Sequence, residues 1–151
     1  MRKSADVVIP MLPNSNFTLL YPAQIDWKKF LEYRPDIPFS DKVIEFLNIL
    51  SGALLKDRSS RLYPDVITFA FFCRKANLQK LMSEYVRKDE LRLGRGLLFH
   101  IAPSNVPINF GYSLVAGLLS GNTNIVRVSS KQFPLSLIHI SEPTRLGMIS
   151  Y

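Results

Sequence analysis

Apolar residues recur at helical spacing through the first half of the chain. The first such stretch predicts an amphipathic helix over residues 41–56, with Ser40 as its N-cap. The repeating apolar positions of this helix are Val43, Ile44, Leu47, Leu50 and Leu54. Pro64 suits the first turn of a second helix, which we expect to run to about Lys75. Asn77 can cap a third helix, whose apolar face comprises Leu78, Leu81, Met82 and Tyr85.

The pattern changes after Leu91, where two short apolar runs flank one further helix. Residues 96–102 are an apolar run bounded by glycine and proline, which is typical of a buried parallel strand. Pro107 can open a helix that runs to about Leu119 and ends at a glycine-asparagine pair. Residues 123–129 then predict a second strand. Strand, helix and strand within about 35 residues predict a right-handed βαβ unit, whose strand C-terminal ends are where such sheets bind ligands.

These patterns divide the chain into four segments. Residues 1–38 hold short extended runs between prolines and a rigid loop, and we predict an N-terminal arm there. Residues 39–90 are the helical segment, and residues 91–134 begin the βαβ unit. Residues 135–151 do not continue the expected βα pattern, so we predict a non-native tail. The predicted fold class is α/β, with a partial Rossmann-type parallel sheet and N-terminal helices.

Composition narrows the class of protein. The 151 residues are enough for one domain with a core. The hydrophobic fraction of 47% and the charged fraction of 21% are ordinary for a soluble globular protein. The longest apolar stretch, residues 66–73, is far shorter than the roughly 20 residues of a membrane-spanning helix. Asp6 and two early prolines interrupt any signal peptide, and the single cysteine forms no internal disulfide. We therefore expect no membrane span and a cytoplasmic location.

The net charge of +7 is spread over the sequence. Lys and Arg residues are scattered, with no block of five like charges. A solvated surface with excess base explains this pattern better than a nucleic-acid-binding face, although a basic balance also suits an anionic cofactor. We therefore expect no nucleic-acid partner.

Residues 97–131 carry the most specific motif of the chain. The stretch LLFHIAPSNVPINFGYSLVAGLLSGNTNIVRVSSK resembles the signature of LuxC-type acyl-CoA reductases. It is also a variant of the cofactor-domain signature of the aldehyde dehydrogenase superfamily, which runs from a proline-asparagine-proline motif to a glycine-asparagine turn and a lysine-bearing strand. Here these parts are Pro103-Ser104-Asn105-Val106-Pro107, Gly121-Asn122-Thr123 and Arg127. The resemblance covers roughly residues 30–134 and implies an aldehyde dehydrogenase-like fold.

The resemblance also implies an activity. LuxC-type enzymes are NADPH-dependent acyl-CoA reductases that act on long-chain fatty acyl thioesters. A cysteine thiolate takes the acyl group from CoA or a carrier protein, and NADPH then delivers hydride to release a fatty aldehyde. For the parent enzyme the resemblance further implies acyl-protein synthetase or transferase partners, a homo-oligomer and a link to bioluminescence.

The same resemblance assigns roles to individual residues. The asparagine matching Asn105 donates a hydrogen bond to the thiohemiacetal oxyanion; the alternative is that Asn105 only caps the following helix. Arg127 matches a lysine that holds the adenosine ribose or its 2′-phosphate, and the planar guanidinium favours NADPH over NADH. The alternative for Arg127 is a charged side chain that reaches solvent from a strand end. The remaining expected cofactor-binding residues are Ala102, Pro103, Ser104 and Ser129.

Other reactive residue types have simpler interpretations. Cys73 lies in an apolar segment and is expected to be a buried, inert thiol. His100 lies within an apolar strand and is expected to be structural. Gly94-Arg95-Gly96 precedes a strand instead of following one, so it is not a dinucleotide fingerprint. The two histidines and one cysteine have no metal-ligand spacing, and we expect no metal site.

LuxC-type reductases are several hundred residues long, with the nucleophilic cysteine well downstream of the glycine-asparagine turn. We expect the family sequence to end near Pro134 and the following residues to be a translated sequencing adapter; the alternative is a genuine divergent C-terminus. The chain is therefore predicted to be an N-terminal fragment without reductase activity by itself. Two other functions stay open, namely another superfamily reductase such as a glutamyl-phosphate reductase-like enzyme, and a non-catalytic basic binding module, for instance on RNA.

Overall fold

The fold alternates helices with short strands. The computed structural model describes residues 18–21, 26, 30, 32–87, 89–103, 106–128 and 146–150. Its elements are β1 (Thr18–Tyr21), α2 (Asp41–Lys56), the 3-10 helix η1 (Ser60–Leu62), α3 (Pro64–Phe72), α4 (Lys75–Tyr85), β2 (Leu97–Ile101), α5 (Asn109–Leu119), β3 (Thr123–Val128) and β4 (Leu146–Ser150).

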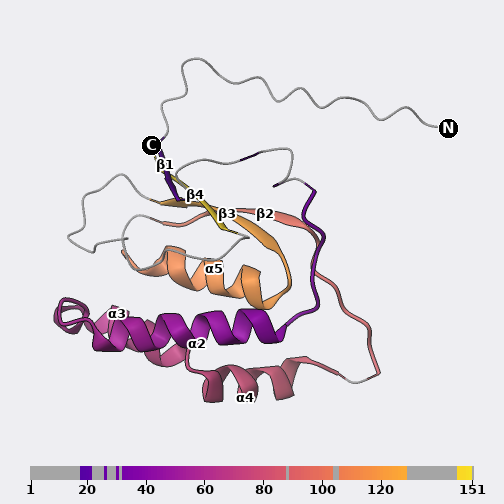
Figure 1. Ribbon diagram of the computed structural model, residues 1–151, viewed down its shortest axis with the longest axis horizontal. Coiled ribbons are helices and arrows are strands. Elements are labelled where there is room, and N and C mark those ends of the chain that lie inside the picture. The colour runs from indigo at the N-terminus through magenta and orange to yellow at the C-terminus, as the bar shows by residue number, and fades with distance from the viewer. Residues whose placement is uncertain are drawn as a thin grey trace.

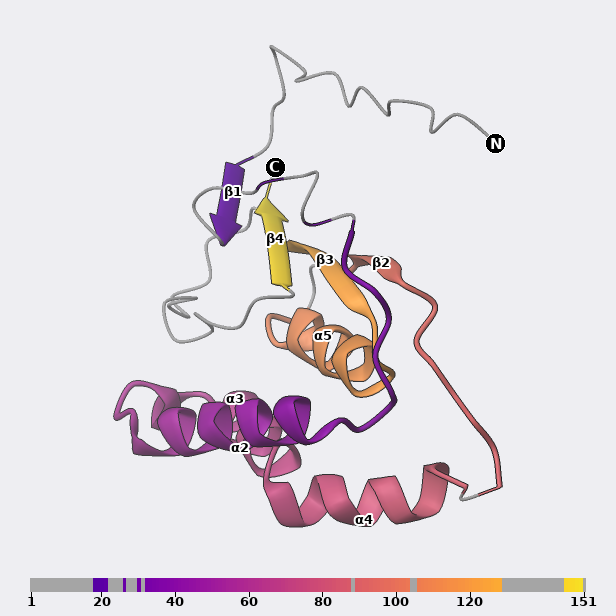
Figure 2. The same ribbon diagram turned by 45° about the vertical axis from the view of Figure 1, so that its right-hand side comes forward.

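The elements are arranged in layers, with α5 at the centre. One side of α5 faces β2 and β3, and α2 and α3 pack on its other side (Figures 1 and 2). The helix α4 lies next to α2 on the side away from the sheet (Figure 2). The described chain is therefore an α/β structure in which one helix separates a sheet from a helical layer.

The sheet has the strand order β1-β4-β3-β2. The strands β2 and β3 pair in parallel and are joined by α5, so the predicted βαβ unit is confirmed. The prediction that residues 96–102 form a buried strand is wrong, because Leu97, Phe99 and Ile101 are exposed. Its helix begins at Asn109, two residues after Pro107. The strand β4, which was not predicted, lies in the segment expected to be a tail, pairs in parallel with β3 and pairs antiparallel with β1.

The three N-terminal helices follow the apolar periodicity, with differences at their ends. The bounds of α2 agree with the predicted 41–56, and Ser40 is at its N-cap. The Ser40 hydroxyl makes no capping hydrogen bond; the backbone oxygen of Ser40 accepts from the amides of Val43 and Ile44. The second helix ends at Phe72, three residues before the predicted Lys75.

The prediction that Asn77 caps α4 is wrong, because α4 begins at Lys75. The amide of Lys75 donates to Oδ1 of Asn48 on α2, at 3.1 Å. The side-chain amide of Asn77 instead donates to the backbone oxygen of Phe72 at 2.8 Å, which satisfies a carbonyl at the end of α3. A side chain 27 positions earlier in the sequence therefore supplies the acceptor at the start of α4.

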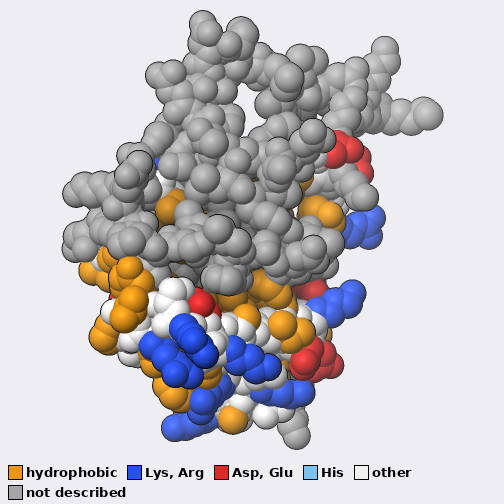
Figure 3. Space-filling model, turned by 60° about the vertical axis from the view of Figure 1, so that its left-hand side comes forward, with side chains coloured by type: hydrophobic (Ala, Val, Ile, Leu, Met, Phe, Trp, Pro, Cys, Tyr) orange, Lys and Arg blue, Asp and Glu red, His pale blue; other side chains and the backbone are white. Residues whose placement is uncertain are grey.

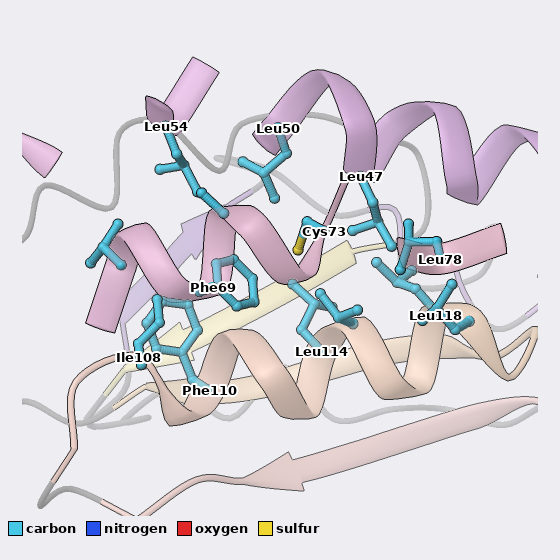
Figure 4. Close-up of a cluster of buried hydrophobic side chains, with 14 of the residues drawn as sticks. Leu47, Leu50, Leu54, Phe69, Cys73, Leu78, Ile108, Phe110, Leu114 and Leu118 are labelled. Atoms are coloured by element: carbon cyan, nitrogen blue, oxygen red, sulfur yellow. The ribbon is translucent and has the colours of Figure 1, made fainter. Parts of the chain in front are cut away.

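The hydrophobic core lies between α5 and the helical layer. Figure 4 shows the side chains of α2, α3, α4 and α5 pointing toward one another in this space. The core residues labelled there are Leu47, Leu50, Leu54, Phe69, Cys73, Leu78, Ile108, Phe110, Leu114 and Leu118. Full burial of one Leu or Phe side chain stabilises a fold by about 1.5–3 kcal/mol, so this cluster is the main source of stability.

None of the described Lys, Arg, Asp or Glu residues is buried in the core. On the face shown in Figure 3, Lys and Arg side chains are interspersed with hydrophobic and uncharged ones. Within the described residues, no helix is long and apolar enough to cross a membrane. The same residues contain no group of three or more His, Cys, Asp or Glu side chains that could hold a metal ion.

Candidate functional site

The βαβ unit brings the ends of two parallel strands to one edge of the sheet. In its register, Ile101 at the end of β2 lies beside Arg127, the second-last residue of β3. Ala102 and Pro103 continue from β2, the first half-buried and the second exposed. Carboxyl ends of parallel strands are the usual ligand-binding edge of α/β sheets, so this edge is the candidate functional site.

The opposite, amino edge of the unit is closed by a hydrogen-bonded turn. Oδ1 of Asn122 accepts from the amides of Arg95 at 2.6 Å and Gly96 at 3.2 Å. Asp36 donates its amide to the oxygen of Gly121 at 2.8 Å. Gly121 has φ +77°, and a Cβ there would lie 2.1 Å from the oxygen of Asp36, so only glycine fits. The glycine-asparagine pair therefore ends α5 as predicted and also aligns the start of β2.

A polar pair lies between the sheet and α5. Nε2 of His100 on β2 lies 2.8 Å from Oδ1 of Asn124 on β3. The side-chain amide of Asn124 donates to the backbone oxygen of Asn122 at 2.8 Å, which fixes Oδ1 as the acceptor for the imidazole. A Cβ at Gly117 on α5 would lie 2.0 Å from this same Oδ1. The absence of a side chain at Gly117 therefore makes room for the pair.

This cluster was missed by the sequence reasoning, which assigned His100 only a structural role. Asn124 is the second residue of a strand rich in β-branched residues and is fully buried. A buried amide requires hydrogen-bond partners, so a polar residue at that position indicates a partner on a neighbouring element. The contact of His100 with Asn124 agrees with the expected structural role.

The residues predicted for the site are divided between described and undescribed positions. Arg127, Ala102 and Pro103 lie together at the carboxyl edge of β2 and β3. The other predicted site residues, Ser104, Asn105 and Ser129, lie outside the described residues. The N-cap position of α5 is Ile108.

Arg127 extends from the face of β3 opposite α5. Its neighbours Val126 and Val128 are buried in the core beneath α5, whereas Arg127 is half-buried on the other face. The guanidinium is therefore outside the hydrophobic core, beside the end of β2. The side chain as a whole is half-buried there, and its Nε is shielded from solvent.

The single cysteine, Cys73, is buried and is poorly suited to act as a nucleophile. Cys73 follows α3 and has no exposed surface, and its sulfur faces the space between α3 and α5 (Figure 4). Burial raises the pKa of the Cys73 thiol to about 12. The prediction of a buried thiol is confirmed, and the raised pKa explains why this group is a poor nucleophile at neutral pH.

The βαβ unit is similar to one known protein family. Residues 72–142 match the family model described as acyl-CoA reductase (LuxC). The matched range contains α4 and the whole β2-α5-β3 unit, and it continues eight residues past Pro134. A search of curated proteins and a search of solved structures gave no match. The resemblance predicted from the motif at residues 97–131 is thereby confirmed: over residues 72–142, this chain matches the acyl-CoA reductase (LuxC) family model.

Proposed function

We propose that this chain provides the first part of the cofactor-binding unit of an NADPH-dependent acyl-CoA reductase, with an aldehyde dehydrogenase-like fold in the complete enzyme. The observation that carries the proposal is the family match, which contains both strands and the helix of the βαβ unit. The geometry supports it, because Ala102, Pro103 and Arg127, three of the residues predicted to bind the nucleotide, lie at the carboxyl edge of that unit.

The described residues at this edge fit a phosphorylated nucleotide. Arg127 would hold the 2′-phosphate, because a guanidinium donates two parallel hydrogen bonds to phosphate oxygens. Ala102 and Pro103 would bring the backbone close to the nucleotide, with Ser104 and Ser129 as hydroxyl donors. When bound, NADPH supplies the hydride that reduces the thioester.

Asn105 would act on the substrate and not on the cofactor. Its side-chain amide would donate a hydrogen bond to the oxygen of the thiohemiacetal, where negative charge develops during reduction. A donor of this kind contributes roughly 3 kcal/mol to transition-state stabilisation. Because the N-cap position of α5 is Ile108, the helix does not require Asn105 as its cap.

The nucleophile of the reaction would come from outside these 151 residues. Acyl transfer needs a thiolate, and the one cysteine of the sequence is a buried thiol with its pKa raised to about 12. We therefore expect the purified chain to show no NADPH oxidation with a long-chain acyl-CoA. Measurable acyl-CoA-dependent NADPH oxidation by the purified chain would contradict the proposal, and its loss in a Cys73→Ala variant would identify Cys73 as the nucleophile.

The Cys73 thiol also predicts a pH dependence. The pKa is raised from 9.0 to about 12 by burial, so the folded chain holds a proton that the unfolded chain releases. The stability linked to this thiol is present below about pH 9 and is lost as the pH rises toward 12. Urea unfolding from pH 8 to pH 11 should show a decrease in stability that is smaller in the Cys73→Ala variant.

Cofactor binding tests the site directly. The full chain should enhance NADPH fluorescence on titration, and Arg127→Gln should weaken NADPH binding about tenfold while changing NADH binding little, since only NADPH has the 2′-phosphate. Arg61→Gln, at an exposed arginine of η1, is the matched control. Equal weakening of NADPH and NADH by Arg127→Gln would show that this arginine does not read the 2′-phosphate.

A further inference from the structure

A large cavity lies at the other end of the molecule from the proposed cofactor site. It has a volume of about 1200 Å³ and is lined by residues of α4, by residues 86 and 90–95 ahead of β2, and by the C-terminal half of α5. Its wall includes Leu98 near the start of β2, and Leu119 and Asn122 near the turn before β3. Arg127, Ala102 and Pro103 are not part of the wall, so this cavity is separate from the carboxyl edge.

The cavity is mainly apolar, and its rim exposes large hydrophobic side chains. Leu91 is 88% exposed, Tyr85 62% and Leu93 57%. Other exposed apolar residues in the wall are Ile37 and Val86. Apolar side chains gathered around one hollow, and not scattered singly, indicate a binding surface for an apolar group.

The charged groups of the wall give the cavity a positive character. Glu90 accepts hydrogen bonds from Arg92, with Nε at 2.8 Å, and from Arg87 at 3.3 Å. This glutamate is therefore already engaged by two arginines. None of the three ion pairs between described residues includes Arg95, which is exposed and also lines the cavity. The wall thus combines apolar side chains with a cation that can receive an anion.

We propose that this cavity binds a free fatty carboxylate, with the hydrocarbon chain against the apolar wall and the carboxylate at Arg95. The apolar wall favours the hydrocarbon chain of the ligand, because burial of each methylene group is favourable. The guanidinium selects a carboxylate over an alcohol or an ammonium head group. A thioester bound here would be at the amino ends of the strands, opposite the proposed catalytic edge, so the site binds the free acid as a separate ligand and does not hold the reacting substrate.

The first experiment blocks the cavity from an exposed position. Ala116 lines the cavity on α5 and is exposed, so Ala116→Trp fills the space without entering the core. Ala53→Trp is the matched control, because Ala53 is an exposed alanine of another helix, α2. Dodecanoate is titrated calorimetrically into the full chain and both variants. We expect Ala116→Trp to weaken binding at least tenfold and Ala53→Trp to leave it unchanged; equal affinity of the chain and Ala116→Trp would overturn the proposal.

The second experiment tests the head group and does not depend on the first variant. Arg95→Gln should weaken dodecanoate binding about fivefold, whereas Arg61→Gln should not change it, since Arg61 lies on η1 away from the cavity. Dodecanol and dodecyltrimethylammonium should bind the unmodified chain more weakly than dodecanoate. Equal or tighter binding of either, or of dodecanoyl-CoA, would overturn the assignment. Sedimentation gives a further test. If the chain forms a dimer that does not bind dodecanoate and does not dissociate when dodecanoate is added, the assignment would also be overturned.

Discussion

The two faces of the β2-β3 pair differ in how well their side chains are covered. On the inner face, Val126 has no exposed surface and packs in the same core as Leu114 of α5, which is 1% exposed. On the outer face, Leu97, Phe99 and Ile101 are 44%, 51% and 66% exposed. The same two strands thus have an inner face that contributes to the core and an outer face whose apolar side chains gain little from folding.

Residues on the inner face therefore stabilise this chain, whereas residues on the outer face are available for contacts with another layer or partner. Inner residues are held by packing and by the hydrogen bond between His100 and Asn124. Apolar side chains at Phe99 and Ile101 are instead typical of a surface for another layer or partner. Substitutions on the two faces should therefore have effects of very different size, and four predictions follow from this.

The largest effect is expected at the inner face of α5. Leu114→Ala should lower the free energy of unfolding by about 3 kcal/mol, because it removes a buried side chain and leaves a cavity. Leu97→Ala, the same substitution on the outer face, should cost less than about 1 kcal/mol, since Leu97 is already 44% exposed. Urea denaturation followed by circular dichroism measures both. Equal losses would show that the outer face is covered in solution.

A smaller loss is expected where α5 approaches the polar pair. Gly117→Ala should cost about 2 kcal/mol, because its Cβ would lie 2.0 Å from Oδ1 of Asn124 and displace a buried hydrogen-bonded amide. Gly52→Ala is the control, since a Cβ at Gly52 on α2 meets nothing within 4 Å. That substitution should stabilise the chain by about 0.5–1 kcal/mol through helix propensity. Stabilisation by both alanines would argue against close contact at Gly117.

The hydrogen bond between the strands should be visible as a coupling energy. His100→Ala, Asn124→Ala and the double variant form a double-mutant cycle, and we expect a coupling of about 1 kcal/mol. Each single variant leaves one partner unsatisfied beneath α5, so the two losses should not add. Purely additive losses in urea denaturation would indicate that the 2.8 Å contact does not stabilise the fold.

The helices and the βαβ unit could be predicted because their signals are local. The apolar spacing and Ser40 predicted both ends of α2 correctly, and the glycine-asparagine pair predicted the end of α5. The start of α4 could not be predicted in this way, because its first amide is bound by Asn48 from another helix. The strand β4 depends on pairing with β3, a contact that the spacing of residues 146–150 does not reveal.

The candidate site was predictable only in part for the same reason. The motif that begins at Pro103 and the match at Arg127 indicated two strand ends, and the parallel register places Ile101 beside Arg127 at one edge. The pairing of His100 with Asn124 depends on which faces of two strands meet α5, which one sequence does not state. The cavity near Arg95 is lined by residues spread between positions 37 and 122 of the sequence, so no single stretch of sequence predicts it.

The smallest effect is expected on the outer face itself. Phe99→Ser should change the free energy of unfolding by less than about 0.5 kcal/mol, because Phe99 is already 51% exposed. The same change should reduce the binding of a dye that senses exposed apolar surface, since it removes the largest side chain of the outer face. Phe69→Ser, at a ring that is 1% exposed in the core, is the matched control and should unfold the chain. A Phe99→Ser loss approaching that of Phe69→Ser would mean that both faces of the strands are buried, and the distinction between an inner and an outer face would fail.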